Sequence, residues 1–164
     1  MTSIEIGGGT LTQPGWINLD SLNGMGDWRR EAQETPWPAE DSSVDHILAS
    51  HVLEHVPAGE PRIKIFNEVW RVLKPGGIFE VKLPLIITSA GVPSWHSIAD
   101  PTHVSYWCRE SFHYFTARHG TAGTHFSDAV FAANADYGLR LFFETYWAIN
   151  DGFEGHWRAT PAGK

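Results

Sequence analysis

The chain has 164 residues, of which 42% are hydrophobic, 13% are aromatic and 19% are charged. This length accommodates one domain with one core, and the composition is that of a folded protein rather than a disordered one. The formal net charge of −7 argues against a nucleic-acid partner, because binding to a phosphate backbone needs a basic surface. We therefore expect a single domain over residues 1–164. The sequence does not indicate an oligomeric state.

Nothing in the chain has the length and polarity of a membrane or secretion segment. No apolar stretch approaches the roughly 20 residues that cross a bilayer, and residues 1–9 lack the basic and apolar regions of a signal peptide. The single cysteine, Cys108, cannot form an internal disulfide, which fits a reducing compartment. These features predict a soluble, cytoplasmic protein without a membrane partner.

The N-terminal part begins with two short strand candidates. Ser3–Ile6 runs directly into three glycines, and Trp16–Leu19 ends on Asp20. The intervening segment 7–15 is shorter than the roughly 10–12 residues of a normal parallel crossover. Either the helix there is reduced to a turn, or the second strand lies differently from a parallel neighbour. Residues 27–32 follow as a candidate edge strand.

The central part has the pattern of a strand–helix–strand unit. Val44–Ser50 is a buried-strand candidate, and residues 61–73 carry apolar side chains at helical spacing. Lys74-Pro75-Gly76-Gly77 ends this helix, because proline cannot continue it and glycine permits the positive-φ exit. Ile78–Leu83 is the next predicted strand. This order implies a parallel sheet with helices on its faces.

The C-terminal half is less regular. Residues 85–108 form a predicted loop rich in aromatic, histidine and proline residues. A helix is predicted over 109–118, where Phe112 and Phe115 have the spacing of core residues. An aromatic-rich strand is predicted over 139–149, and residues 160–164 are predicted to fray.

Glycines and an acidic residue follow the first two strands. Gly7, Gly8 and Gly9 permit a tight turn and a close approach of a ligand to the backbone, although an ordinary turn explains them equally well. Thr12 stands where a dinucleotide fingerprint needs glycine or alanine, which disfavours nicotinamide and flavin cofactors. Asp20 lies where an acidic side chain accepts hydrogen bonds from ribose hydroxyls. The pattern indicates a nucleoside ligand without a pyrophosphate.

Four segments are similar to motifs of class I S-adenosylmethionine (SAM)-dependent methyltransferases. Residues 5–9 resemble the acidic-x-Gly-x-Gly motif, and 31–38 resemble an acidic-Ala-x-x-Leu-Pro-Phe-Pro segment. Residues 45–56 and 68–77 resemble the "VLEHV" strand end and the "LKPGG" helix end. The resemblance implies an α/β fold: a single Rossmann-like domain with a mostly parallel, doubly wound sheet, here with an abbreviated N-terminal half. It also implies a SAM-dependent methyltransferase.

The resemblance implies, position by position, a SAM site at the ends of three strands. In chain order, its residues are Glu5, Gly7 and Gly9 around the methionine part, Asp20 on the ribose, Glu31 and Ala32 near the adenine, and Ser50 and His51 beside the sulfonium.

The acceptor is predicted to lie against the loop 85–108, because ligands of parallel sheets bind at the carboxyl ends of the strands. A hydroxyl acceptor needs a general base, for which histidine is suited near neutral pH. We predict His103 as this base and His96 as the second candidate. The predicted substrate-binding residues are His55, Trp95, Asp100 and Trp107. A structural role for His55, satisfying backbone groups at a turn, stays open.

We predict transfer to an oxygen or nitrogen of a small-molecule or glycan-like acceptor, without a bound metal. Two alternatives stay open. The shortened first crossover favours a SAM-binding protein without turnover. The three side chains of His96, Asp100 and His103 favour a metal-dependent enzyme, because histidine and aspartate ligate divalent metals. Asp100 also has the position of a residue that only caps a turn.

Overall fold

The computed structural model describes residues 1–164 except 23–25, 89, 116–142, 152–153 and 162. Its helices and strands, in chain order, are β1 (Ser3–Ile6), β2 (Ile17–Leu19), β3 (Val44–Ser50), η2 (Leu53–His55), α1 (Glu60–Val72), β4 (Leu73–Pro84), η3 (Trp95–Ser97), η4 (Arg109–Phe115), β5 (Phe143–Asp151) and β6 (Glu154–Pro161). The η elements are short 3₁₀ helices.

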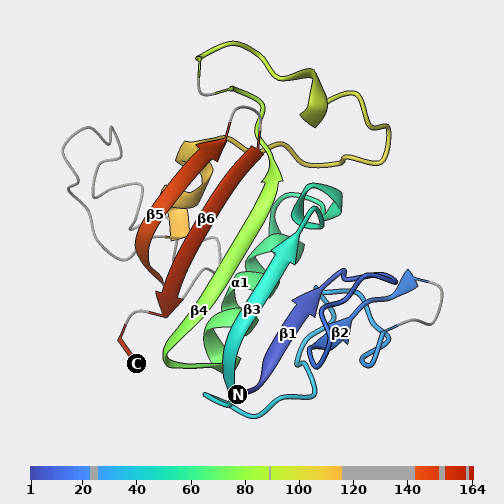
Figure 1. The fold of residues 1–164 in the computed structure, drawn as a ribbon, viewed down its shortest axis with the longest axis vertical. Coiled ribbons are helices and arrows are strands. Elements are labelled where there is room, and N and C mark those ends of the chain that lie inside the picture. Colours follow the sequence, from blue (N-terminus) through green and yellow to red (C-terminus); the bar gives the residue numbers. More distant parts are fainter. Residues whose placement is uncertain (23–25, 89, 116–142, 152–153, 162) are drawn as a thin grey trace.

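The strands form one sheet in the order β2-β1-β3-β4-β6-β5. Strands β1 to β4 are mutually parallel, whereas β6 runs antiparallel to β4 and β5 runs antiparallel to β6. The mostly parallel α/β fold is thus confirmed. The carboxyl ends of β1, β3 and β4 meet at one edge of the sheet, and the loop that follows β4 rises beyond that edge (Figure 1).

The connection between β1 and β2 contains no helix, since residues 7–16 form only turns and irregular chain. The second strand nevertheless lies parallel to the first, with Ile4 paired to Ile17. Of the two arrangements left open by the sequence, the helix reduced to a turn is therefore the observed one. The predicted edge strand over 27–32 is wrong, because only Trp28 pairs with β2, in a single bridge to Leu19.

Helix α1 agrees with the predicted helix within one residue at each end. Gly59 precedes it with a φ of 89°, and Pro61 lies in the first turn, where a missing N–H costs nothing. Strand β4 begins at Leu73, five residues earlier than predicted. The Lys74–Gly77 segment therefore leaves the helix as extended chain and leads directly into the sheet.

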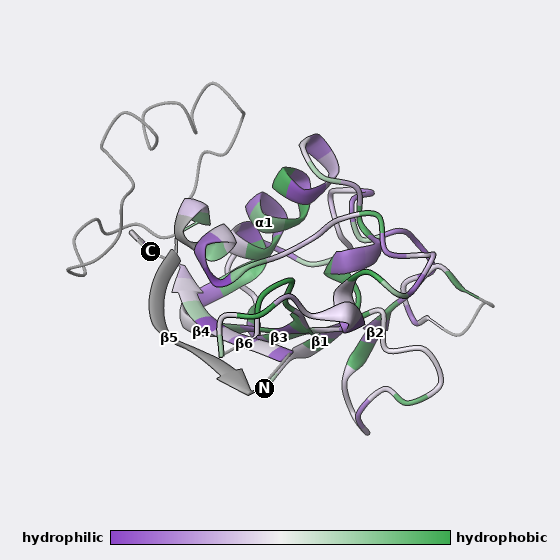
Figure 2. Ribbon diagram, turned by 90° about the horizontal axis from the view of Figure 1, so that it is seen from above, coloured by the Kyte–Doolittle hydropathy of each residue, from purple (hydrophilic) through white to green (hydrophobic). Residues whose placement is uncertain are grey.

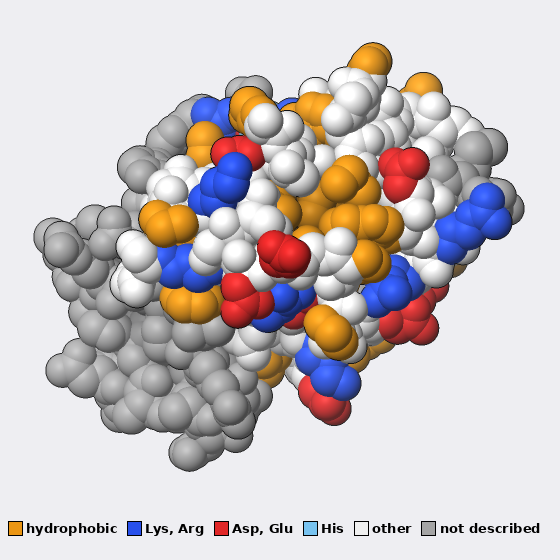
Figure 3. Space-filling model, turned by 90° about the horizontal axis from the view of Figure 1, so that it is seen from below, with side chains coloured by type: hydrophobic (Ala, Val, Ile, Leu, Met, Phe, Trp, Pro, Cys, Tyr) orange, Lys and Arg blue, Asp and Glu red, His pale blue; other side chains and the backbone are white. Residues whose placement is uncertain are grey.

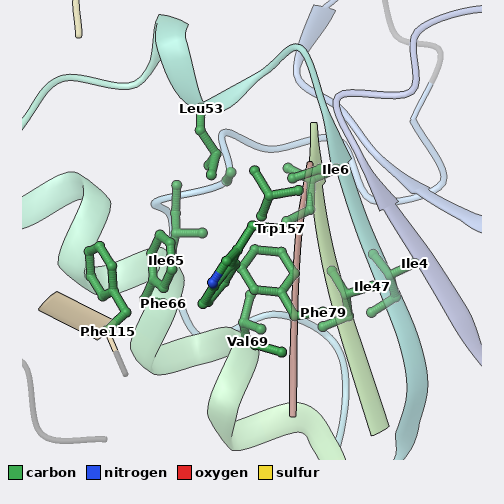
Figure 4. Packing of buried hydrophobic residues seen from close by; sticks show 14 of the residues in the cluster. Ile4, Ile6, Ile47, Leu53, Ile65, Phe66, Val69, Phe79, Phe115 and Trp157 are labelled. Atoms are coloured by element: carbon green, nitrogen blue, oxygen red, sulfur yellow. The ribbon is translucent and has the colours of Figure 1, made fainter. Parts of the chain in front are cut away.

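The core lies between α1 and the sheet. Phe66 of α1 contacts Phe79 of β4 edge-on with ring centroids 5.6 Å apart, and its ring lies 5.9 Å from Trp157 of β6. Phe115 of η4 stacks on Phe66 at 3.7 Å, so the predicted core role of this residue is confirmed. Phe112 is buried as well. Figure 4 shows how these aromatic side chains fill the space between helix and strands.

The two faces of the sheet differ. Helix α1 lies on one face of the row of strands (Figure 2), and the stacking of η4 on Phe66 places η4 on that face too. Most strand side chains that alternate with the core residues are polar, with Leu48 and Ile78 as apolar exceptions. Among them, Glu80 bonds to Arg158 at 2.8 Å and lies 3.5 Å from His46. Burial lowers the pKa of His46, although the neighbouring Glu80 acts in the opposite direction.

Residues 160, 161 and 164 have fixed partners where fraying was predicted over 160–164, of which residue 162 lies outside the described residues. Residues 160 and 161 belong to β6, a strand absent from the sequence prediction. The ammonium of Lys164 donates hydrogen bonds to the carbonyl oxygens of Arg71 and Leu73, both at 2.7 Å. These carbonyls belong to the end of α1, where cations are stabilising. The expected fraying is therefore wrong. The predicted strand over 139–149 is observed from residue 143, and the predicted helix 109–118 is observed as η4; residues 116–118 and 139–142 lie outside the described residues.

On the surface seen from below, acidic and basic side chains are interspersed around an apolar area (Figure 3). No continuous basic region forms among the described residues of this face. Within the described parts of the chain, none of the helices combines the length and the apolar character needed to cross a membrane.

Candidate functional site

A cavity of about 430 Å³ lies at the carboxyl ends of β1, β2 and β3. Its wall is formed by Ile6, Gly7, Leu19, Asp20, Ser21, Leu22, Arg30, Glu31, Ala32, Gln33, His51, Val52, His55, Val56 and Thr102. Small-molecule sites commonly have volumes of about 300–1,000 Å³. Five of the predicted cofactor residues line it, together with His55. Glu5, Gly9 and Ser50 are not among the lining residues.

The side chains of Asn18 and Glu5 accept hydrogen bonds that hold the glycine turn after β1 and the loop that follows it. Gly7 has a φ of 68°, and a Cβ there would lie 2.7 Å from Val52 Cγ2, so the position requires glycine. Asn18 Oδ1 accepts the Gly8 N–H at 3.2 Å. Glu5 Oε2 accepts the Gln13 N–H at 3.0 Å. Glu5 thus fastens the loop that replaces the missing helix, on the side of the sheet away from the cavity.

Asp20 is buried at the end of β2 with both carboxylate oxygens engaged. Oδ2 accepts the Gly9 N–H at 2.8 Å, and Oδ1 accepts the Leu22 N–H at 2.7 Å. A carboxylate offers about four acceptor sites in all. These two bonds therefore fix the orientation of the carboxylate and leave further acceptor capacity on the cavity wall.

A buried tryptophan places the segment that carries Glu31 and Ala32. Trp37 Nε1 donates to the Ala32 carbonyl at 2.9 Å, and the Trp37 backbone N–H donates to Glu68 of α1 at 2.6 Å. Arg30 donates to the Pro36 carbonyl at 2.7 Å. The segment is thereby fastened to the core, and it brings the small side chain of Ala32 to the cavity.

His51 begins the turn after β3 with a φ of 54°, which is uncommon for a residue other than glycine. Its Nδ1 lies 3.4 Å from Glu54 Oε1, and its Nε2 lies 2.9 Å from Glu154 Oε2 of β6. The Glu54 and Glu154 carboxylates raise the pKa of His51, although partial burial opposes them. His51 therefore joins the cavity wall to the antiparallel part of the sheet.

The loop after β4 brings His103 to η2. The backbone N–H groups of Val104 and Ser105 both donate to the Glu54 carbonyl at 3.0 Å. As a result the His55 and His103 rings meet edge-on, with centroids 4.9 Å apart. Asp100 Oδ1 accepts bonds from the Thr102 N–H at 2.8 Å and the Thr102 hydroxyl at 2.6 Å. Asp100 therefore caps the turn that positions His103.

His96 lies apart from this group. It stacks on Trp95 with ring centroids 3.7 Å apart, and neither residue lines the cavity. Trp95 is 66% exposed. The alternative metal site of His96, Asp100 and His103 does not form a cluster among the described residues; the three residues that do are Glu54, His55 and His103.

The predicted substrate role of Trp107 is contradicted by its burial. The side chain is 0% exposed, stacks on Phe112 at 5.2 Å and lies beneath the Arg62 guanidinium at 3.8 Å. Its backbone pairs with Leu85 at the start of the loop. Trp107 is a core residue that anchors the loop's return to the domain, and Trp95 is the exposed tryptophan of the loop.

Comparison with known proteins agrees with the fold described above. Residues 21–81 match the model of a family described as a methyltransferase domain. Two similar solved structures are SAM-dependent methyltransferases. The one from Thermotoga maritima has a TM-score of 0.61 and 15% identity, over 97% of this chain and 81% of that chain. The one from Archaeoglobus fulgidus has a TM-score of 0.59 and 15% identity, over 96% and 85%.

The chain has the Rossmann-like methyltransferase fold. The YcgJ protein from Bacillus subtilis shares this fold as well, with a TM-score of 0.53 and 14% identity over 98% of this chain and 89% of that chain. A search among curated proteins finds no significant match. In this chain, β1 and β2 are joined by turns and irregular residues, and the cavity lies at the carboxyl ends of the strands.

Proposed function

We propose that this protein is a SAM-dependent methyltransferase that acts on an oxygen or nitrogen of a small-molecule or glycan-like acceptor. The observation that carries the proposal is the cavity itself. Gly7, Asp20 and Ala32 meet there, at the carboxyl ends of the strands of a methyltransferase fold. A cytoplasmic location remains a prediction from the sequence.

The residues of the cavity fit a nucleoside better than a dinucleotide. The Asp20 carboxylate is oriented by two backbone N–H groups and can accept the hydroxyls of a ribose. The apolar side chains of Ile6, Leu19 and Val56 offer a surface for a base. Arg30 also lines the cavity, but its guanidinium bonds to the Pro36 carbonyl and serves the local fold. SAM meets these requirements, since it carries ribose and adenine without a pyrophosphate.

Bound SAM would supply a methyl group on a positively charged sulfur that is already a good leaving group. The chain then has to orient the two reactants and exclude water. Gly7 permits close approach of the cofactor to the backbone, and Asp20 holds the ribose. The loop 85–108 lies beyond the strand ends and forms the acceptor side. Trp95 and Tyr106, 66% and 52% exposed, offer flat apolar surfaces on which a ring of the acceptor can pack.

An acceptor hydroxyl must also lose a proton. His103 is the base predicted from the sequence, and its Nδ1 bonds to the Ser97 carbonyl at 2.9 Å. The ring lies behind His55, which itself lines the cavity. This arrangement supports a role for His103 near the acceptor. His96 is the less favoured base, because it lies apart from His103 and does not line the cavity.

The proposal is tested by incubating the protein with methyl-labelled SAM and a panel of phenolic, amine and sugar acceptors, with S-adenosylhomocysteine release as the readout. We expect acceptor-dependent release that His103→Ala lowers at least 100-fold and His96→Ala leaves within about threefold. Tight SAM binding without release by any acceptor would favour the binding protein without turnover. The shortened connection between β1 and β2 is the observation that supports this second candidate function.

A further inference from the structure

We propose that Glu54, His55 and His103 bind one divalent transition-metal ion, such as Zn²⁺, at the wall of the cofactor cavity. One ligand atom from each of the three residues lies within 4.8 Å of those of the other two. Two imidazoles and one carboxylate form a ligand set that suits zinc, iron, cobalt and nickel, whereas Mg²⁺ and Ca²⁺ prefer oxygen ligands alone.

The first observation behind the proposal is the state of Glu54. Its side chain is only 2% exposed, and among the described residues neither carboxylate oxygen has a hydrogen-bond partner. His51 Nδ1 lies 3.4 Å from Oε1. Burial of an ionised carboxylate without partners is strongly unfavourable. A bound cation would compensate this burial.

The second observation is the hydrogen bonding of the two histidines. His103 Nδ1 lies 2.9 Å from the Ser97 carbonyl, which can only accept. His55 Nδ1 lies 3.2 Å from the Thr102 carbonyl and 3.2 Å from the Thr102 hydroxyl. That hydroxyl donates its own proton to Asp100 at 2.6 Å, so towards His55 it too can only accept.

Both Nδ1 atoms must therefore carry a proton, which in neutral rings leaves both Nε2 lone pairs available. Carbonyl groups that fix the second nitrogen in this way are typical of metal-binding histidines. Asp100 Oδ2 is 3.8 Å from His103 Nε2, too far for a hydrogen bond. Neither nitrogen is thus committed to a strong partner on its ligand side.

The third observation is that the arrangement is built by backbone contacts between distant segments. Val104 and Ser105 donate to the Glu54 carbonyl, and the Ser105 hydroxyl donates to the Leu53 carbonyl at 2.9 Å. Glu54 and His55 are adjacent in η2, while His103 comes from the loop after β4. The fold therefore holds the three side chains in place without an ion.

The position also indicates a use for the ion, and this part rests on the proposed function. His55 lines the cofactor cavity and His103 belongs to the loop proposed for the acceptor side, so an ion held by both would lie where the two sides meet. A divalent ion there would favour loss of the proton of an acceptor hydroxyl to water. The oxygen then forms its bond to the methyl carbon while the carbon–sulfur bond breaks, and the electron pair remains on sulfur in S-adenosylhomocysteine. His103 would serve as a ligand in this case and not as the base.

The test uses the full chain without a histidine tag, titrated with Co²⁺ and followed by visible absorption, and with Zn²⁺ by calorimetry. We expect one equivalent to bind, with the absorption bands of cobalt in a nitrogen and oxygen site. Glu54→Gln and His103→Ala should each weaken binding at least 100-fold. His96→Ala, a histidine of the same loop outside the cluster, should bind within about threefold of the wild type.

Glu54→Gln also distinguishes a metal-ligand role of Glu54 from a purely structural role. It removes a buried charge while keeping the shape, so the metal-free variant should unfold at the same or a higher temperature than the wild type, and added Zn²⁺ should no longer raise that temperature. Weak or absent binding by the wild type, or equal binding by Glu54→Gln, would overturn the metal site. Titration with S-adenosylhomocysteine on the same samples reports the cofactor site independently, so a failure of either proposal can be recognised by itself.

Discussion

Replacing Gly7 by alanine should damage the cavity wall through one defined contact. Gly7 has a φ of 68°, and its new Cβ would lie 2.7 Å from Val52 Cγ2 and 3.0 Å from Val52 Cβ. Gly9 offers the matched control, because its φ is 56° and a Cβ there meets nothing within 4 Å. Both substitutions place alanine in the left-handed region, but only the first also forces Val52 to move.

The left-handed conformation costs a non-glycine residue about 1–2 kcal/mol. An added methyl group in a packed position costs about a further 1–3 kcal/mol. Gly9→Ala should therefore lower the free energy of unfolding by about 1–2 kcal/mol, and Gly7→Ala by about 2–5 kcal/mol. In a Val52→Ala background the 2.7 Å contact with Cγ2 disappears while the 3.0 Å contact with Cβ stays, so the two alanines at positions 7 and 52 should be non-additive by about 1–2 kcal/mol.

Urea unfolding of the four variants and the wild type measures these differences. Because Val52 lines the cavity and Gly9 does not, Gly7→Ala should also weaken S-adenosylhomocysteine binding, and by more than Gly9→Ala, which keeps the N–H that bonds to Asp20. Equal destabilisation by Gly7→Ala and Gly9→Ala, with additivity within about 0.5 kcal/mol at positions 7 and 52, would show that the described contact with Val52 is wrong.

Two further predictions concern the core and the polar face of the sheet. Trp107→Ala should lower the free energy of unfolding by about 3–5 kcal/mol, whereas Trp95→Ala should change it by less than about 0.5 kcal/mol. Urea unfolding measures both values, and a small effect of Trp107→Ala would contradict its core role and favour the predicted substrate role. The pKa of His46 is lowered in the folded protein, so at this residue the unfolded chain binds more protons near pH 6, and its contribution to stability should fall as the pH drops from about 8 to about 5. His46→Gln should remove this contribution, so the variant should lose less stability than the wild type over that range; urea unfolding measures it, and an unchanged profile in His46→Gln would contradict the assignment.

The parts of the fold that the sequence predicted well are those with strong local signals. Residues 44–50 and 61–73 combine the apolar pattern of one element with clear end signals, and both are observed within a residue. β6 was missed, although Gly155, Trp157 and Ala159 alternate with polar residues as a strand requires. Its glycine weakens that pattern, and its burial depends on pairing with β4 and β5, which no local feature reveals.

The candidate site was predicted in its outline but not in its contacts. Asp20 and Ala32 line the cavity as expected: Asp20 follows the end of β2, and Ala32 belongs to a motif segment that Trp37 fastens to the core. Trp107 was predicted to bind the substrate because it lies in irregular chain, whereas its side chain is buried in the core at the end of the loop. In the sequence, Glu54 was considered only as part of the "VLEHV" motif. Its proximity to His103 depends on backbone hydrogen bonds between segments about fifty residues apart, and a single sequence does not predict such bonds.

The most direct test of the central claim is calorimetric titration of the purified protein with SAM and S-adenosylhomocysteine, on the wild type, Asp20→Ala and Asp27→Ala. Both aspartates accept backbone N–H bonds next to β2, but only Asp20 lines the cavity. We predict micromolar binding that Asp20→Ala weakens at least tenfold, about 1.4 kcal/mol, while Asp27→Ala stays within about twofold. No binding of either compound, or equal binding by Asp20→Ala, would contradict the assignment of this cavity to SAM.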